Sequence, residues 1–443
     1  MRTLAAKRRE RRVPIGSLGR VCLAAGLLAA LAGCGGGGSD DRPGPSGPPA
    51  VLRVPEQYGT IQKAVDVARS GDMVLVSSGV YRESVQLRTP RVVLRGADRN
   101  TVVVDGEFKR SNGITVTGAA SVVENLTVRN NLANGVLFTG VTDKTLQGAG
   151  AGGSGYNPLD TAKFPALRGF RASYVTAYDN ALYGIYAFDA RDGVIEHSYG
   201  SGQADSGIYV GQCDPCNTLV AHNTTEHNAV GIEVTNASRG LYFLGNTVRR
   251  NRVGMTVQSN NLEALGPQHQ AVIAANLIAD NNEARSPEQA DGGFGLGVGI
   301  GGGTNNLFER NRVQGNSRAA FVLQDEQGYP VQGNVIRSNI LEDGQLGLVV
   351  QAARTGGNCF TGNGDSVPTS PDRLPSALTT CPGGDTALAS PGQPRAVPVP
   401  PGVSFRDVPA PPAQPGLPNA PHAPARPAVG LPGRVDPARY PLP

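Results

Sequence analysis

The chain has 443 residues, of which 40 are basic and 36 acidic, so its formal net charge is +4 at neutral pH. Seven of the basic residues and one acidic residue lie in residues 1–33, a segment with the features of a cleaved export leader. The remainder then holds 33 basic and 35 acidic residues, a net charge of about −2. The leader thus accounts for the basic character, and no basic stripe remains to suggest a nucleic-acid partner.

Residues 1–33 combine a basic start, MRTLAAKRRERR, with the apolar run VCLAAGLLAALAGC. The final LAGC resembles a bacterial lipobox, which implies that Cys34 becomes the lipidated first residue after cleavage. The alternatives are a leader without lipid and a membrane-anchoring helix, although the apolar run is short for a membrane span. Residues 34–50 are Gly-, Pro- and Ser-rich and predict a flexible tether. We therefore expect an extracytoplasmic protein that is anchored to the bacterial cell membrane through Cys34.

Residues 51–111 predict an N-terminal cap and the first coils of a repeat structure. A short amphipathic helix is expected, because Ile61, Ala64, Val65 and Ala68 have helical spacing. Thr60 is the expected N-cap of this helix, and Gly71 is the expected residue just past its C-terminus. The short runs MVLVS, VQL, VVLRG and TVVVDG that follow predict strands. A repeat protein needs an atypical terminal element to close its core and protect its edge, and this helix is the candidate.

Residues 112–365 contain a repeat that is clearest from Gly184 to Val253. Three successive units of roughly 23 residues each begin Gly-Ile-x-Ala or Gly-Ile-x-Val and later carry an Asn-rich turn. Each unit has short β-branched runs without helical periodicity, which predicts one coil of a parallel β-helix per unit. Similar coil starts recur at Gly135, Gly254, Gly297, Ala320 and Gly347.

The coil starts also predict the core. The second and fourth residues of Gly-Ile-x-Val point to one face of a strand, so each should stack with its equivalents in neighbouring coils. The first inward column is Ile185, Ile208, Ile232, Met255, Val298, Phe321 and Leu348, and the second is Ala187, Val210, Val234, Val257, Ile300, Leu323 and Val350. Stacked Asn amides should bond corner backbone groups of neighbouring coils. The expected ladders are Asn223, Asn246, Asn276 and Asn311, and Asn228, Asn251, Asn281 and Asn316.

The helix and the coils together resemble the pectin-lyase-like superfamily of right-handed parallel β-helices. The first part of the resemblance is a TIQ…A…A…GD…V…V…G…Y…E pattern, and the block GIYVGQ…HN…EHNAVGIEV…GNTVRRN resembles secreted bacterial β-helix-repeat proteins. The resemblance covers roughly residues 51–365 and implies an all-β fold, a single-stranded right-handed parallel β-helix. It does not imply one activity, because the superfamily includes lyases, hydrolases, epimerases and proteins without catalysis.

Two stretches near 139–172 and 259–295 break the period and predict insertions. Long loops on a solenoid often carry function, although decoration without a role is the alternative. Residues 366–443 are Pro- and Ala-rich, which favours polyproline II over a packed domain. We expect a disordered spacer in the final stretch, and the segment around Phe405 is a candidate for docking along the coils.

Four cysteines remain after the leader and Cys34: Cys213, Cys216, Cys359 and Cys381. An even number in an oxidising compartment favours disulfides. The local pairs Cys213–Cys216 and Cys359–Cys381 are favoured because a β-helix separates the two pairs by several coils, but the other pairings stay open. The CxxC motif is also compatible with redox activity or metal binding, although a second CxxC and a thioredoxin-like context are both missing.

The outward positions of the coil starts predict a ligand-binding face. Tyr186, Tyr209 and Glu233 should lie in adjacent coils, so aromatic rings alternate with polar groups there. Rings of this kind stack on sugars, and carboxyl and amide groups bond sugar hydroxyls, which favours a polysaccharide or another envelope component as the partner. The alternative is a solvated β-face whose tyrosines reflect strand preference alone. The expected contact residues are Tyr209, Gln212, Glu233 and Gln258.

The string from Tyr186 to Arg191, YAFDAR, resembles the Tyr-Gly-Phe-Asp-Pro-His string of alginate C5-epimerases. The resemblance implies catalytic roles for Tyr186 and Asp189, with Arg191 in the place of the His. It departs at Gly211, where an acid is expected, and an arginine base would need a pKa far below its usual value above 12. A lyase or epimerase is therefore the alternative to a non-catalytic binding module. No cofactor and no metal are expected, since the sequence has no tight group of acids.

Overall fold

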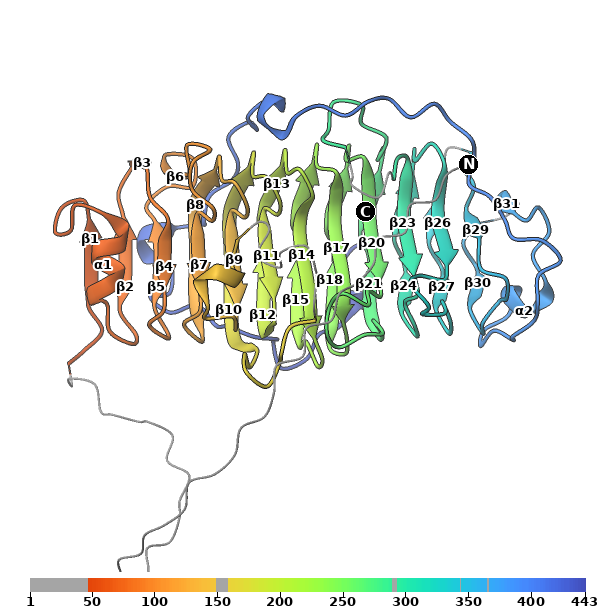
Figure 1. The fold of residues 1–443 in the computed structure, drawn as a ribbon, viewed down its shortest axis with the longest axis horizontal. Coiled ribbons are helices and arrows are strands. Elements are labelled where there is room, and N and C mark those ends of the chain that lie inside the picture. The colour runs from red at the N-terminus through yellow and green to blue at the C-terminus, as the bar shows by residue number, and fades with distance from the viewer. Residues whose placement is uncertain (1–46, 149–157, 289–292, 343, 365) are drawn as a thin grey trace, which may run out of the picture. The chain divides into compact units, whose positions relative to one another are not determined.

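The computed structural model describes residues 47–148, 158–288, 293–342, 344–364 and 366–443. The predicted leader, Cys34 and most of the tether lie outside these ranges. Within them, every strand belongs to one of two large sheets, and the pairings between the strands are parallel (Figure 1). The helices of the described ranges do not reach the length and apolar character that a membrane span requires.

Each central coil contributes two consecutive strands to one sheet and one strand to the other. In one such coil, β15 (Thr218–Ala221) and β16 (Thr224–Glu226) lie in the 20-stranded sheet A, and β17 (Val230–Ala237) lies in the 11-stranded sheet B. Each strand pairs with its equivalents in the preceding and following coils. This arrangement confirms the predicted all-β parallel β-helix.

The strand bounds follow the coils in order. Sheet A contains β1 (Val51–Val54), β2 (Met73–Val76), β3 (Gly79–Tyr81), β5 (Val93–Gly96), β6 (Val102–Asp105), β8 (Ser121–Arg129), β10 (Leu167–Tyr178), β12 (Ala190–Glu196), β13 (Tyr199–Ser201), β15, β16, β18 (Leu241–Leu244), β19 (Thr247–Arg249), β21 (Ala271–Ala274), β22 (Leu277–Ala279), β24 (Leu307–Glu309), β25 (Arg312–Gln314), β27 (Val335–Arg337), β28 (Ile340–Leu341) and β30 (Cys359–Thr361). Sheet B contains β4 (Val85–Leu87), β7 (Ile114–Val116), β9 (Val136–Thr139), β11 (Ile185–Phe188), β14 (Ser206–Cys213), β17, β20 (Val253–Gln258), β23 (Leu296–Gly301), β26 (Ala319–Gln324), β29 (Leu348–Val350) and β31 (Thr369–Ser370).

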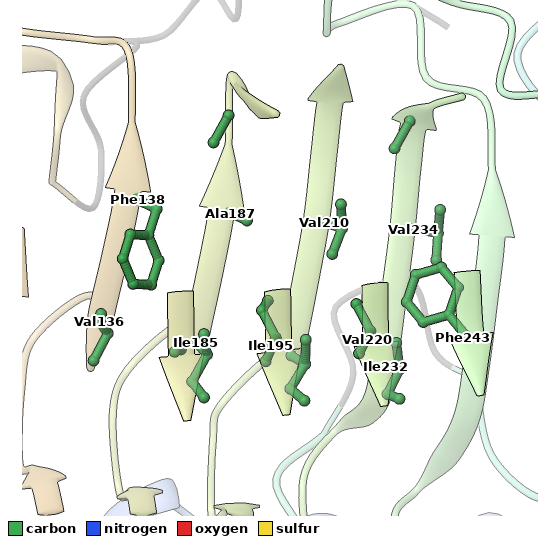
Figure 2. Close-up of a cluster of buried hydrophobic side chains, with 14 of the residues drawn as sticks. Val136, Phe138, Ile185, Ala187, Ile195, Val210, Val220, Ile232, Val234 and Phe243 are labelled. Atoms are coloured by element: carbon green, nitrogen blue, oxygen red, sulfur yellow. The ribbon is translucent and has the colours of Figure 1, made fainter. Parts of the chain in front are cut away.

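The core lies between the two sheets, as the repeat predicts. Ile208 pairs in register with Ile185 on one side and Ile232 on the other, and all three are fully buried. Figure 2 shows such side chains from sheet B and sheet A meeting between the sheets. Both predicted columns are confirmed over all seven coils. Each buried branched side chain contributes about 1.5–3 kcal/mol relative to an exposed one.

Asparagine ladders line the corners of the coils. Asn246 receives hydrogen bonds from the backbone and side chain of Asn223 and donates from its own backbone and side chain to Asn276 Oδ1, at 2.9 Å each. Its Nδ2 also donates to Val220 O, so it satisfies buried backbone groups of the preceding coil. Both predicted ladders are confirmed and run further than expected. A third ladder, which the sequence analysis missed, joins Gln268, Asn306, Asn334 and Asn358.

Short helices occur at both ends of the stack. Helix α1 (Ile61–Val67) covers the first coils, and Thr60 Oγ1 accepts from the backbone N–H of Lys63 as predicted. The helix ends earlier than expected, because Ala68 is its C-cap and Gly71 lies beyond it with a left-handed φ of 98°. At the other end lies α2 (Ser376–Thr379).

The two insertions differ from the expected ranges. The first occupies the connection from β9 to β10, which begins at Leu167, and includes the short 3-10 helix η1 (Lys144–Leu146); residues 149–157 lie outside the description. The stretch from Ser259 to Gly295 is not one insertion. It contains β21 and β22, which supply the two sheet A strands of a regular coil, so the irregular parts are the loops on either side of them.

The proline-rich tail is not a free spacer, which corrects the sequence-based expectation. Residues 391–443, the C-terminal strap, run across the coils (Figure 1) and include η2 (Phe405–Asp407), η3 (Ala420–His422) and η4 (Pro437–Arg439). Arginine side chains of the coils donate hydrogen bonds to its backbone carbonyls. These arginines are Arg95, Arg99, Arg171, Arg252, Arg310, Arg312 and Arg318.

Apolar contacts add to these bonds. Leu431, Val435 and Tyr440 of the strap pack against an outward apolar patch of sheet A that includes Leu219 and Leu244. The ring of Tyr440 also stacks on the imidazole of His222, with 5.1 Å between centroids. A proline-rich segment has little entropy to lose in the extended conformation, so a few such contacts are enough to dock it.

Candidate functional site

The outer face of sheet B carries the predicted row of aromatic and polar side chains. Tyr186 of β11 pairs with Tyr209 of β14, Tyr209 pairs with Glu233 of β17, and Glu233 pairs with Thr256 of β20. One outward position further along, Gln258 donates to Glu233 Oε1 at 3.2 Å. The sequence therefore placed these side chains in the correct order.

Three tyrosine rings meet beside this row. Tyr183, which precedes β11, lies with its ring centroid 4.5 Å from that of Tyr186 and 4.7 Å from that of Tyr209. Tyr186 and Tyr209 are 4.9 Å apart in an edge-to-face arrangement, and Phe188 lies 5.4 Å from Tyr186. Tyr183, Tyr186 and Phe188 are half-buried, so the cluster offers an aromatic surface to solvent.

Tyr209 itself does not face solvent, contrary to the expectation that its ring stacks on a ligand. Its exposed fraction is 2%, and its hydroxyl donates a 2.5 Å hydrogen bond to Glu263 Oε1. The ring lies against Gly211, where a β-carbon would come within 2.3 Å of it. The departure from the epimerase string at Gly211 thus has a steric reason, since an acid there would displace Tyr209.

Glu263 belongs to the loop after β20, and corner amides hold this loop over the sheet. Gln212 Oε1 accepts from the backbone N–H of Ala264 at 3.0 Å. Asn236, one coil further, donates from Nδ2 to the carbonyls of Asn260, Glu263 and Ala264. Gln212 was expected to contact a ligand. It is fully buried, so it positions the loop instead.

Glu233 lies among hydrogen-bonding groups and other acids. Ser206 Oγ and Gln258 Nε2 each donate to its carboxyl at 3.2 Å. Burial raises the pKa of Glu233 well above its usual range, and the carboxyls of Asp205 and Glu263 raise it further. Asp205 also forms a side-chain hydrogen bond with Glu233 that raises this pKa. Burial and the neighbouring carboxyls therefore favour the protonated form of Glu233.

The carboxyl of Glu263 has a different set of neighbours from that of Glu233. Burial raises its pKa to about 7, and the hydrogen bond from Tyr209 lowers it in part. Its Oε2 atom is buried and has no hydrogen-bond partner among the described residues. Burial, together with the nearby carboxyls, also raises the pKa of Tyr183 and of Tyr209 well above the usual tyrosine value, which favours the neutral phenols, and that of Tyr209 donates to Glu263. We call this group the tyrosine–carboxylate site, made of Tyr183, Tyr186, Asp205, Tyr209, Glu233, Gln258 and Glu263.

Two glycines continue the rows of this site in the next coil, and the side chain of Glu326 lies against one of them, Gly301. Gly299 continues the row after Thr256, and Gly301 continues the row after Gln258. A β-carbon on Gly299 would have only Met255 O within 4.0 Å among the described residues. Flat groups such as sugar rings can approach the backbone there.

Of the three predicted catalytic residues, Tyr186 belongs to this site, whereas Asp189 and Arg191 lie away from it. Asp189 is 1% exposed and lies at the corner after β11, with Oδ2 close to Gly140 of the first insertion. Arg191 belongs to β12 in sheet A, and its Nε lies 3.5 Å from Asp192. Because only 1% of Asp189 is exposed, its carboxyl does not face a ligand on the outer side of sheet B. The sequence string crosses a corner of the coil, which its resemblance to the epimerases did not reveal.

Sequence reasoning did not select Tyr183 or Glu263. Tyr183 occupies the position just before the coil start, where most other coils have Val, Ser or Leu, and this departure is a usable signal. Glu263 lies in a loop outside the repeat, so no register leads to it. Asp205 directly precedes β14 and was not among the expected contact residues.

The four cysteines form Cys213–Cys216 and Cys359–Cys381 disulfides. Cys213 and Cys216 are 1% and 0% exposed and pack in the core, so the CxxC motif closes a corner between sheets B and A. Within the described ranges, no group of three or more His, Cys, Asp or Glu side chains is arranged to hold a metal ion.

A family described as right handed beta helix region matches residues 112–265 and 255–370, which together are more than half of the chain. The chain belongs to the right-handed β-helix family. No match was found among curated proteins. The family assignment and the parallel strand pairing both indicate a parallel β-helix, and the family description adds that it is right-handed. Neither indicates an activity.

Several solved structures resemble this right-handed β-helix protein. The A-module of mannuronan C-5 epimerase AlgE6 of Azotobacter vinelandii is 15% identical, with a TM-score of 0.48 over 71% of this chain and 94% of that chain. The AlgE4 A-module of the same organism is 14% identical, with a TM-score of 0.43 over 72% and 94%. An alginate lyase of Paenibacillus sp. is 15% identical, with a TM-score of 0.32 over 66% and 95%. None of these values assigns an activity to the right-handed β-helix protein.

Proposed function

We propose that this right-handed β-helix protein works outside the cytoplasm and binds a polysaccharide on the outer face of sheet B, at the tyrosine–carboxylate site. The leader-like start and the LAGC segment support export and a lipid anchor on Cys34. A lipid on Cys34 and the Gly- and Pro-rich tether after it would hold the coils near the bilayer surface.

The observation that carries the proposal is the half-buried aromatic cluster next to partly exposed polar groups. Tyr183 and Tyr186 offer ring faces, and Glu233 and Gln258 offer acceptors and donors within the same two to three coils. Sugar rings stack on aromatic faces through their C–H surfaces, while their hydroxyls need hydrogen-bond partners of both kinds. The flat floor at Gly299 extends the surface along the stack, as an elongated ligand requires.

A glycan screen with the full chain tests this function. Tyr186→Ala removes a stacking face and Gln258→Ala removes an amide, so each should lower the affinity for the same polysaccharide by about tenfold. Arg337→Ala, on the outside of sheet A, is the matched control and should bind as the wild type does. Wild-type protein that binds no polysaccharide, or variants that bind equally well, would rule out this face.

A further inference from the structure

We propose that residues 408–420 of the strap form a preorganised polyproline II ligand for a second protein, one whose binding groove is lined by aromatic side chains. The inference goes beyond the proposed function, because it concerns the strap and a protein partner. The observation that carries it is the pattern in which the side chains of this segment are exposed.

Exposure in this segment repeats every three residues. One residue in three is buried or half-buried against the coils, and the two residues between successive inward positions are exposed. The inward residues are Val408, Pro411, Gln414, Leu417 and Ala420. The backbone of residues 408–418 forms no hydrogen bond with another backbone group of the described residues. A polyproline II helix has three residues per turn and no internal hydrogen bonds, so both observations indicate this conformation.

The two exposed positions of each turn form two ridges with different side chains. The first, which we call the proline ridge, consists of Pro409, Pro412, Pro415 and Pro418. The second consists of Ala410, Ala413, Gly416 and Asn419. Successive prolines of the proline ridge are about 9 Å apart, since each residue of a polyproline II helix rises about 3.1 Å. A groove on a partner would therefore meet a line of proline rings beside a line of small side chains.

Docking on the coils does not account for the proline ridge. Contact with the coils constrains only the inward residues, and proline stiffens an extended chain at any of the three positions of a turn. Of the five prolines in residues 408–420, Pro411 points inward, four lie on one exposed ridge and none lies on the other. Recognition by a groove requires this placement on one solvent-facing line, whereas stiffening alone does not.

Contacts with the coils fix which side of this segment faces solvent. Arg99 Nη1 donates to Pro415 O at 2.7 Å. Asn100 Nδ2 donates to Gln414 O at 3.0 Å, and Asn100 Oδ1 accepts from the backbone N–H of Gln414 at 2.8 Å. These bonds hold the segment against rotation about its long axis. A partner then does not have to order it, which lowers the entropic cost of binding.

The chemistry of the proline ridge indicates the kind of partner. Proline-rich segments in the polyproline II conformation dock in grooves lined by aromatic side chains, where the rings of both partners pack together. Residues 408–420 contain no charged side chain, so ion pairs do not contribute to recognition within this segment. We therefore expect an apolar interaction whose affinity changes little with salt concentration.

The test first selects a probe with a synthetic peptide of residues 408–420. A panel of SH3 and WW domains, which bind proline-rich segments in aromatic-lined grooves, is screened against this peptide by isothermal titration calorimetry. The domains that bind the peptide are then titrated with the full chain. We expect the full chain to bind the same domains more tightly than the peptide does, because its proline ridge is already ordered.

Variants of the full chain show whether the proline ridge makes the contact. Pro412→Ala and Pro415→Ala should each lower the affinity by about tenfold. The matched control is Pro432→Ala, which changes an exposed proline of the strap outside this segment and should bind as the wild type does. Circular dichroism checks that the coils of each variant are folded. A strap released by either substitution would still be accessible as the peptide is, so a tenfold loss reports the prolines themselves.

The inference is overturned if no domain of the panel binds the peptide. Binding of the peptide without binding of the full chain would also overturn it, because the proline ridge would then be inaccessible on the docked strap. Equal affinities of Pro412→Ala, Pro415→Ala and wild type would exclude the proline ridge as the contact. Association of the full chain only with itself, as sedimentation would show, would assign the ridge to a second copy and contradict a different protein as the partner. The polysaccharide screen is independent of each of these results.

Discussion

The hydroxyl of Tyr209 donates to Glu263 Oε1 and so joins the floor of sheet B to the loop that covers it. Tyr209→Phe removes this donor and keeps the ring, so the pKa of Glu263 should rise above about 7. A hydrogen bond worth ~1 kcal/mol corresponds to a rise of roughly 0.7 of a pKa unit. An NMR titration of the Glu263 carboxyl carbon measures it, with Tyr242→Phe on sheet A as the control. An unchanged pKa would mean that the bond does not form in solution.

The stability of the protein should fall as pH rises from about 4 to about 7. Burial raises the pKa of Asp189 to about 7, so the folded state holds a proton there that the unfolded state has already lost. The contribution is therefore complete below the unfolded pKa and is lost as pH rises through the folded pKa, with a slope of up to about 1.4 kcal/mol per pH unit. Asp189→Asn should make the fall in melting temperature with pH less steep, while Asp179 and Glu263, whose pKa values are also raised to about 7, keep part of the slope. Identical profiles for both proteins would contradict this prediction.

A charge in the inner column should unfold the coils. Ile208 is fully buried between Ile185 and Ile232, so Ile208→Asp places a carboxyl without partners in the core, at a cost of several kcal/mol. Thr247→Asp, at a half-buried outward position of β19, should cost less than about 1 kcal/mol. Chemical denaturation followed by circular dichroism measures both. Equal stability of the two variants would be incompatible with the assigned register.

Loss of one arginine should release the end of the strap. Arg310 donates to Pro437 O and Tyr440 O at 2.9 Å each, and these charged bonds are worth ~1.5–3 kcal/mol each. Arg310→Ala should therefore speed proteolytic cleavage within residues 430–443, as limited digestion and mass spectrometry would show. Arg337→Ala removes an arginine of the same sheet that pairs with Glu309 and should leave the cleavage rate unchanged. Equally fast digestion of wild type and Arg310→Ala would argue against docking.

The lipid anchor can be tested in cells. Cys34→Ala removes the residue that would carry the lipid, so the protein should leave the membrane fraction for the medium or remain unprocessed. Fractionation with an antibody to the coils measures its distribution. A Cys34→Ala protein that stays membrane-bound and is processed normally would show that the anchor is not a lipid on this residue.

The sequence predicted the coils well because their structure is local and repeated. The Gly-Ile-x-Val starts define the register, and the two inward columns and both asparagine ladders follow from it. The prediction was less complete where loops interrupt the repeat. The ladder through Gln268 and Asn306 was missed; its first member is a glutamine in the loop after β20, outside the repeat.

The site was predicted only in part, for the same physical reason. Register placed Tyr186, Tyr209 and Glu233 side by side, but Glu263 reaches them through a loop whose path depends on Gln212 and Asn236. Tyr209 is buried because that loop covers it. The repeat sequence around Tyr209 contains no pattern that predicts this burial. Docking was predicted only around Phe405, whose ring lies 5.8 Å from that of Phe108. Docking of the rest of the strap was missed because proline-rich composition carries no periodicity, and the arginines that hold it are scattered over many coils.

The strap also changes how the stack comes apart. In a solenoid each coil touches only its neighbours, so unfolding can begin at an end and proceed coil by coil. Here one continuous segment is bonded to Gly71 next to α1, through Arg426, and also to Arg318 and Arg312 many coils away. Fraying of either end must therefore break contacts that belong to the strap as a whole. The strap therefore links coils that would otherwise touch only their neighbours, and because it follows the coils in the chain, it can dock fully only after these coils have formed.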